Sequence, residues 1–173
     1  MDFMQTVVEF LLIYLPPMVA NGSPVVISKI IKTHPIDMGK SWKDGRRILG
    51  EGKSIEGAIG GILAGWITAS IIGYAYGALQ TLSITGLVSS FGAMCGDIIK
   101  SFFKRRLGFE RGKMLPIADQ LDFYLGATLA IYLCRNCVRP GIEVFILGLL
   151  LIPFLHIFTN KIAYKLKLKN VPW

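Results

Sequence analysis

The sequence predicts an all-α fold, a polytopic integral membrane protein with five transmembrane helices whose cytoplasmic loops form the functional site. Of the 173 residues, 53% are hydrophobic and 17% are charged, and the mean hydropathy is +0.54. An ordinary soluble domain is about 25% charged. Apolar stretches of the length that a bilayer requires, roughly 20 residues, recur along the chain, and the basic residues fall between them. We expect a single membrane domain over residues 1–173.

The first three predicted spans follow from the positions of the charges. Residues 5–26 form the first span, in which Glu9 is the one charged side chain. The following stretch, residues 57–96, carries no charge over 40 residues. This length suffices for two helices, so we expect spans at 56–77 and 81–98 with a tight turn between them.

The last two predicted spans differ in the charged residues that they contain. The fourth, at 117–134, begins with the carboxylates Asp119 and Asp122, and the fifth, at 142–160, is almost entirely apolar. Helices are expected throughout because, in lipid, only a helix or a closed barrel satisfies every backbone hydrogen bond.

Basic residues are concentrated in alternate connections. The loops at about 27–55 and 99–116 and the C-terminal tail hold 17 of the 19 Lys and Arg residues, and the opposite side holds Arg135 and Arg139. Because cytoplasmic loops are enriched in Lys and Arg, we predict a multi-pass protein of the cell membrane with its N-terminus outside and its C-terminus and site in the cytoplasm.

The net charge of +8 exceeds what orientation requires. The excess indicates contact with membrane lipids of anionic headgroup or with a polyanionic substrate at the cytoplasmic face. No nucleic acid is expected as a partner.

Small residues recur every four positions along the second span, a spacing that lets another helix approach closely. They are Gly57, Gly61, Gly65, Ala69, Gly73 and Gly77. The row could pack within the chain or against a second copy, so a homodimer stays open.

Three carboxylates, Asp97, Asp119 and Asp122, lie at the cytoplasmic ends of apolar spans. An ionisable group at membrane depth is unfavourable and therefore a functional candidate. Asp119 and Asp122 are three residues apart and share a helix face, where their charges repel. A divalent cation would relieve this repulsion, and carboxylates without His or Cys favour Mg²⁺. We predict all three as metal ligands and catalytic residues. The alternative is that they pair with Lys100, Lys104 or Arg105.

A basic run, "KSFFKRRLGFERGK", lies between these acids. Lysine and arginine bind phosphate oxygens, and acids that hold a metal beside such cations are what a nucleoside triphosphate site needs. We therefore predict Lys104 and Arg105 as catalytic and Ser101 and Arg111 as substrate-binding residues. A solvated juxtamembrane run is the alternative.

The stretch "GEGKS", residues 50–54, resembles the end of a phosphate-binding P-loop. That motif requires a glycine five residues before the second glycine, and Arg47 occupies this position. No apolar strand precedes it either, so the P-loop interpretation fails.

Taken together, Ser101-Phe-Phe-Lys104-Arg105, then Pro116, then Asp119-Gln-Leu-Asp122 is similar to the C-terminal signature of CDP-diacylglycerol synthases, S-x-x-K-R, P, D-R-x-D. Gln120 replaces the arginine, and the His-Gly-Gly segment of that signature is missing. This shorter form, with "DGRRILGEGKSIEG" and "ANGSPV", resembles the archaeal branch of the family, the CDP-archaeol synthases.

The resemblance implies a nucleotidyltransferase that moves CMP from CTP to an isoprenoid glycerol phosphate lipid with Mg²⁺. It also implies that residues 44–57 cover bound CTP, and an ordinary surface loop is the alternative. The candidate substrate-binding residues outside the basic run are Asn21, Asp44, Arg46, Arg47 and Lys53. For Asn21, the alternative is that it ends the first helix.

Three other classes of membrane protein fit the sequence less well. A CDP-alcohol phosphatidyltransferase would need an Ala-Arg pair at a set offset after Asp44-Gly45, and the sequence lacks it. A small membrane transporter would place ionisable groups near the midplane and often shows inverted repeats, whereas here the charges gather at one face. A non-enzymatic membrane scaffold would leave the acidic and basic cluster unexplained.

Overall fold

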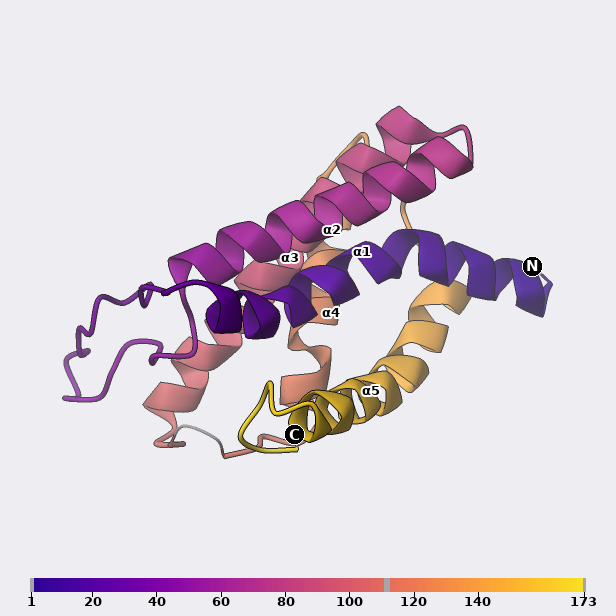
Figure 1. Cartoon of the computed structure of the whole chain (residues 1–173). Coiled ribbons are helices and arrows are strands. Elements are labelled where there is room, and N and C mark those ends of the chain that lie inside the picture. The colour runs from indigo at the N-terminus through magenta and orange to yellow at the C-terminus, as the bar shows by residue number, and fades with distance from the viewer. Residues whose placement is uncertain (1, 111–112, 173) are drawn as a thin grey trace.

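The computed structural model of the chain describes residues 2–110 and 113–172, and these ranges are built from helices without regular strands (Figure 1). The helices are α1 (Phe3–Ile30), α2 (Ile55–Ala75), α3 (Leu79–Arg106), α4 (Ala118–Leu133) and α5 (Ile142–Lys165). The predicted all-α class is confirmed.

Three helices run past the predicted spans. α1 continues to Ile30, α3 to Arg106 and α5 to Lys165. Hydropathy marks where the apolar side chains end, whereas the backbone hydrogen bonds of a helix continue as long as the sequence permits. The first part of the basic run therefore lies on α3 and not in a loop.

Four of the described helices, α1, α2, α3 and α5, are long and apolar enough to cross a membrane. α4 has 16 residues, and at a rise of about 1.5 Å per residue it is shorter than a hydrocarbon core of about 30 Å. A fifth crossing, by α4, stays a prediction.

α4 packs against α1, α3 and α5 (Figure 1). Tyr14 of α1 is hydrogen-bonded to Thr128 of α4 at 2.9 Å, and the hydroxyl of Tyr124 donates to the backbone oxygen of Phe145 in α5 at 2.8 Å. These buried hydroxyls have partners, as an apolar interior requires. α4 is thus held in one orientation, which fixes the direction of its acids.

The small residues of α2 face the inside of the chain. A Cβ added at Gly61 would lie 2.6 Å from the backbone oxygen of Ala20, and one at Gly65 would lie 2.7 Å from that of Pro16. The row therefore lets α2 approach α1 closely. It no longer argues for a homodimer, which stays a prediction.

Glycines also bring α3 and α4 into backbone contact. A Cβ at Gly96 would lie 2.3 Å from the backbone oxygen of Asp122, and one at Gly126 would lie 2.4 Å from that of Gly92. This close crossing places Asp97 beside Asp122.

The long connections gather at one end of the bundle (Figure 1). We call this the loop end: it comprises residues 31–54, the described parts of 107–117, and the tail 166–172. The α2–α3 turn and the α4–α5 connection lie at the opposite end. The predicted grouping of the basic segments at one end is confirmed, and the side of the membrane that the loop end faces stays a prediction.

Candidate functional site

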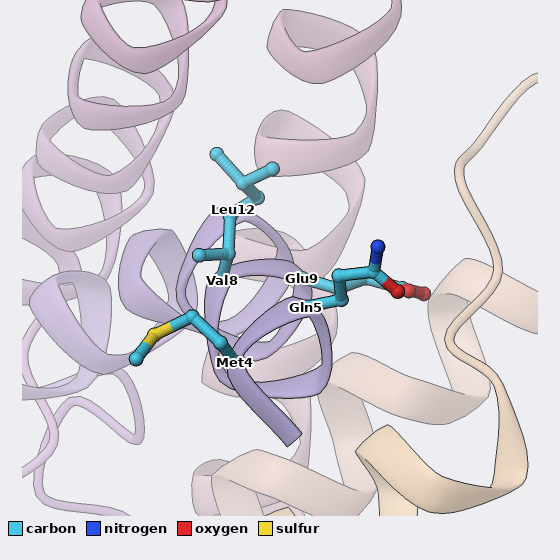
Figure 2. Close-up of a pocket in the computed structure, with 5 residues that line it drawn as sticks. All are labelled: Met4, Gln5, Val8, Glu9 and Leu12. Atoms are coloured by element: carbon cyan, nitrogen blue, oxygen red, sulfur yellow. The ribbon is translucent and has the colours of Figure 1, made fainter. Parts of the chain in front are cut away.

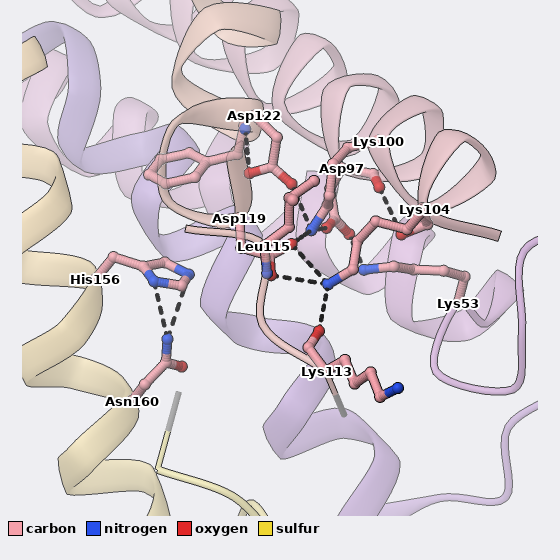
Figure 3. A network of polar contacts seen from close by, with 12 residues as sticks. Lys53, Asp97, Lys100, Lys104, Lys113, Leu115, Asp119, Asp122, His156 and Asn160 are labelled. Atoms are coloured by element: carbon pink, nitrogen blue, oxygen red, sulfur yellow. Dashed lines mark hydrogen bonds and ion pairs between the residues drawn. The ribbon is translucent and has the colours of Figure 1, made fainter. Parts of the chain in front are cut away.

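Six charged side chains meet at the loop end and form what we call the acid–lysine cluster (Figure 3). α3 supplies an acid and two lysines at i, i+3 and i+7, α4 supplies two acids from its first turns, and the loop before α2 supplies one lysine. The members are Lys53, Asp97, Lys100, Lys104, Asp119 and Asp122. The structure thus brings together the three predicted acids and two of the predicted basic residues.

The ammonium of Lys100 lies at the centre of the cluster. Its Nζ atom is 3.3 Å from Asp97, 3.0 Å from Asp119 and 2.8 Å from Asp122. Lys104 donates to both oxygens of Asp119, at 3.0 and 2.8 Å, and to the backbone oxygen of Lys113 at 2.7 Å. Lys104 therefore holds Lys113, in the loop between α3 and α4, against the site.

The "GEGKS" stretch has two separate uses. The side chain of Ser54 caps α2 by accepting a hydrogen bond from the amide of Gly57 at 3.1 Å. Lys53 points the other way, and its ammonium is paired with Asp97. The turn thus serves as a helix cap that delivers a lysine to the acids.

Asp122 is the most enclosed acid of the cluster, with its side chain 4% exposed. Its Oδ2 atom is buried and accepts no hydrogen bond, so its 2.8 Å contact with Lys100 is an ion pair without hydrogen-bond geometry. Lys100 is thus the cation that this oxygen contacts in the structure.

The pairing of the acids with Lys100 and Lys104, which the sequence left as an alternative, is confirmed. Within the described ranges, no set of three or more Asp, Glu, His or Cys side chains is arranged to hold a metal ion as it stands. The donors nevertheless suit Mg²⁺, because all are carboxylate oxygens and they converge on one cation, the ammonium of Lys100. The predicted Mg²⁺ stays a prediction.

Ser101 borders the cluster, and Arg105 follows its member Lys104 in the chain. The hydroxyl of Ser101 is buried and donates to the backbone oxygen of Asp97 at 2.8 Å. Arg105 donates to the backbone oxygen of Phe109, while its Nε atom is buried without an acceptor near Gly50. An unsatisfied buried donor is unfavourable, so Arg105 is suited to receive an incoming phosphate oxygen.

Contacts that join the first loop to the end of α3 involve three predicted residues, Asp44, Arg46 and Arg47. Arg106, which sequence reasoning did not select, donates to Asp44 at 2.6 Å and to the backbone oxygen of Arg47 at 2.6 Å. Arg46 donates to the backbone oxygen of Arg106 at 2.9 Å. The first loop is therefore docked on the end of α3, and a substrate contact by these three residues stays a prediction.

Two predicted residues have other outcomes. Asn21 lies half-buried within α1, and the alternative that it ends the helix is wrong, because α1 continues to Ile30. Its contact with a substrate stays a prediction. Arg111 lies outside the described residues.

Asp37 organises the first loop, and sequence reasoning missed it because nothing distinguishes it from a surface acid. Its carboxylate has no exposed area and accepts hydrogen bonds from Arg47 and from the amides of Gly39, Leu49 and Gly50. Burial by itself raises the pKa of Asp37, but the hydrogen bonds from Arg47 and from the three amides outweigh it and hold the pKa well below its usual range.

We expect Asp37→Asn to open the first loop, because a neutral amide cannot replace an anion with this many donors. Each lost hydrogen bond to a charged group is worth about 2 kcal/mol. Limited digestion with trypsin at Lys40 and Lys43 should become at least about tenfold faster, since cleavage follows the population of the open form.

Glu51→Gln in the same loop is the control, because Glu51 is 62% exposed and lies 3.7 Å from Arg47. The folded-state pKa of Asp37 is depressed, so its stabilisation is present above the unfolded value of about 3.9 and is lost as the pH falls through the folded-state pKa. The difference between the variants should therefore be constant from pH 6 to pH 8. Equal cleavage rates would show that Asp37 does not hold the loop.

The C-terminal tail turns back towards the cluster. After α5, Lys167 has a φ of 57° and the amide of Leu168 donates to the backbone oxygen of Ala163 at 2.9 Å. The ammonium of Lys169 then donates to Asn160 at 2.9 Å, and Asn160 contacts His156 (Figure 3).

The positive charge of Lys169 interacts with the charges of the cluster. Burial lowers the pKa of Lys169, and the positive charges of Lys53 and Lys100 lower it further. The tail therefore folds back onto α5 at the loop end, a contact that the basic count alone could not locate.

A groove on α1 lies elsewhere. It has a volume of ≈ 470 Å³, and the residues that line it, Met4, Gln5, Val8, Glu9 and Leu12, all belong to the first turns of α1 (Figure 2). These turns lie away from the loop end, and we place no substrate site there.

The chain is similar to known proteins along nearly its whole length. Residues 3–173 match the family model described as CarS-like, CDP-archaeol synthase. A CDP-archaeol synthase of Sulfolobus acidocaldarius is 44% identical over 163 residues, which is 94% of this chain and 96% of the relative. Those of Hyperthermus butylicus (43% identity, 97% of each chain) and Saccharolobus solfataricus (48% identity, 94% of each chain) are also similar.

A solved structure of an intramembrane enzyme for archaeal membrane lipid biosynthesis has a similar fold. The TM-score is 0.77 at 39% sequence identity, over 88% of this chain and 93% of that one. Together with four helices of spanning length and composition, this similarity identifies a membrane protein.

Proposed function

The chain belongs to the CarS-like, CDP-archaeol synthase family, and from that premise we propose that it transfers CMP from CTP to an isoprenoid ether-linked glycerol phosphate. One observation carries the proposal: three carboxylates and three lysines converge at the ends of apolar helices, where a lipid headgroup and a nucleotide can meet.

The reaction joins two anions. An oxygen of the lipid phosphate attacks the α-phosphorus of CTP, a new P–O bond forms, and the bond to the β-phosphate breaks, so that pyrophosphate leaves with the electron pair. The nucleophile needs no general base, because the second pKa of a phosphate monoester is about 6. Charge repulsion between the reactants is the main obstacle.

The cluster is suited to reduce this repulsion. Asp97, Asp119 and Asp122 would hold Mg²⁺, which supplies positive charge to the phosphates when bound. Lys53 and Lys104 have flexible stems and can turn from the acids to phosphate oxygens, and the unsatisfied Nε atom of Arg105 adds a donor. Held donors of this kind stabilise charge in the transition state.

The lipid tails would remain among the exposed apolar side chains of the helices. Ile59, Leu63, Ile67 and Ile71 repeat along one face of α2 and are each at least 45% exposed. A lipid bound with its tail in the bilayer presents its phosphate at the loop end, which is where the cluster lies.

The test is to incubate the purified protein with CTP labelled at the α-phosphate and with an ether-linked isoprenoid glycerol phosphate or an ester-linked phosphatidic acid. We expect label to enter the organic phase with Mg²⁺, to remain in the aqueous phase with EDTA, and to prefer the ether lipid. If folded protein transfers label to neither lipid, the proposal is wrong, and the transporter and scaffold alternatives become stronger.

A further inference from the structure

Lys100 lies at the point on which the three acids of the cluster converge. Its ammonium lies within 3.3 Å of Asp97, Asp119 and Asp122, and its side chain is 17% exposed. The acids come from two helices and all turn towards this one atom (Figure 3). Three carboxylates that converge on a point form the donor set of a cation site, and here the cation is the protein's own.

An ammonium and a metal ion cannot share this point. Oxygen ligands lie about 2.0–2.1 Å from Mg²⁺, whereas the acids lie 2.8–3.3 Å from Lys100 Nζ. Binding of Mg²⁺ by the three acids therefore requires Lys100 to leave and the carboxylates to close in. This explains why the acids converge although no set of them is arranged to hold a metal as it stands.

The charges of the cluster are already balanced. Asp97, Asp119 and Asp122 contribute three negative charges, and Lys53, Lys100 and Lys104 contribute three positive ones. A divalent ion alone would leave a surplus of positive charge in a largely enclosed place. Phosphate groups that arrive with the metal would offset this surplus and give the displaced ammonium a new partner.

We infer that Lys100 holds the cation position of the three aspartates until substrate arrives, and then moves onto a phosphate group of the substrate. The inference rests on the proposed function. The phosphate belongs to the nucleotide or to the lipid headgroup, and both present the same anionic oxygens to a lysine. Lys100 is thus a gate that keeps the acids closed to metal without substrate.

The first test measures binding of Mn²⁺ without nucleotide, by electron paramagnetic resonance, to the full chain in detergent. Lys100→Met should bind Mn²⁺ at least about tenfold more tightly than the wild type, because the positive charge that occupies the cation position is removed. Lys100→Arg keeps the charge and should resemble the wild type, as should Lys29→Met, an exposed lysine in the last turn of α1. Unchanged affinity in Lys100→Met, or an equal gain in Lys100→Arg, would overturn the inference.

Stability gives a second readout. Without Lys100 the acids repel, so Lys100→Met should unfold at a lower temperature in EDTA and recover with Mg²⁺, whereas the wild type should respond little to Mg²⁺ alone. If Lys100→Met cannot be recovered folded, Lys100→Gln makes the same charge change and keeps a polar donor among the acids. If Mg²⁺ raised the unfolding temperatures of the wild type and of the neutral variant equally, Lys100 would not exclude metal from the acids, and the inference would be wrong.

Kinetics identify the phosphate that receives Lys100. A rise in KM for CTP in Lys100→Met assigns the nucleotide, and a rise in KM for the lipid assigns the headgroup. Unchanged KM and kcat for both substrates would overturn the second half of the inference. Absence of transfer in the wild type would instead refute the proposed function, and the Mn²⁺ comparison, which uses no substrate, would still decide whether Lys100 holds the site.

Discussion

Asp122→Asn is expected to lower the rate of CMP transfer at least about 100-fold, the order of effect of removing one preorganised electrostatic group. Asp122 is the most enclosed acid of the cluster, and its Oδ2 atom accepts no hydrogen bond in this structure. An amide has the same shape but carries no charge and binds Mg²⁺ poorly. The loss should appear in kcat and should not be recovered by more CTP.

The substitution separates chemistry from folding. Lys100 would still be paired with Asp97 and Asp119, and the amide of Phe123 could still donate to the new side-chain oxygen, as it does to Asp122 at 2.6 Å. We therefore expect an unfolding temperature close to that of the wild type. Asp119→Asn would not separate catalysis from folding as well, because Asp119 also accepts hydrogen bonds from the amide of Leu115 and from Lys104.

Glu143→Gln, in the first turn of α5 at the opposite end, is the matched control and should keep full activity. Label transfer from CTP and thermal unfolding in detergent are the two measurements. Full activity in Asp122→Asn would remove this residue from the catalytic set and with it the Mg²⁺ assignment of the cluster.

Gly96→Ala is expected to have the second large effect, on stability and activity together. A Cβ at this position would meet the backbone oxygen of Asp122 at 2.3 Å, and backbone atoms cannot turn aside as a side chain can. Forced overpacking typically costs about 1–3 kcal/mol. At about 2–4 °C per kcal/mol for a chain of this size, the unfolding temperature should fall by several degrees.

The loss of activity has a geometric cause. Gly96 precedes Asp97, so separation of α3 from α4 moves Asp97 away from Asp122, and activity should fall even at temperatures where the variant is folded. Gly22→Ala provides the comparison, because nothing lies within 4 Å of a Cβ at that position of α1. If Gly96→Ala were as stable and active as Gly22→Ala, the close crossing would not be needed to assemble the site.

Much of the fold could be predicted from the sequence because hydropathy reports which solvent each segment prefers. Forty uncharged residues after residue 56 could only be two helices with a turn, and α2 and α3 follow that expectation. The helices α1, α3 and α5 continue past the predicted spans, because a helix can continue where apolar side chains stop. The fourth predicted span, 117–134, coincides with α4, but α4 has only 16 residues, so its crossing of the membrane stays a prediction.

The site could be predicted in part, for a similar reason. Asp97, Asp119 and Asp122 stood out because charges in apolar segments are unfavourable unless they have a use or a partner. Asp37, Arg106 and Lys169 did not stand out, because each lies among other polar residues and gains its importance from contacts across the fold.

The sequence by itself determined the class of protein, the end of the bundle at which its charges gather and the three acids of the site, since these depend on the preference of each segment for lipid or water. Only the tertiary structure decided that Lys100 lies among those acids, that Arg106 joins the end of α3 to the first loop and that the small residues of α2 face inward. Those facts depend on how closely two helices approach and at what rotation. Contacts between residues that are distant in the sequence set the separation and the rotation of the helices, and neither can be read from a local stretch of the chain.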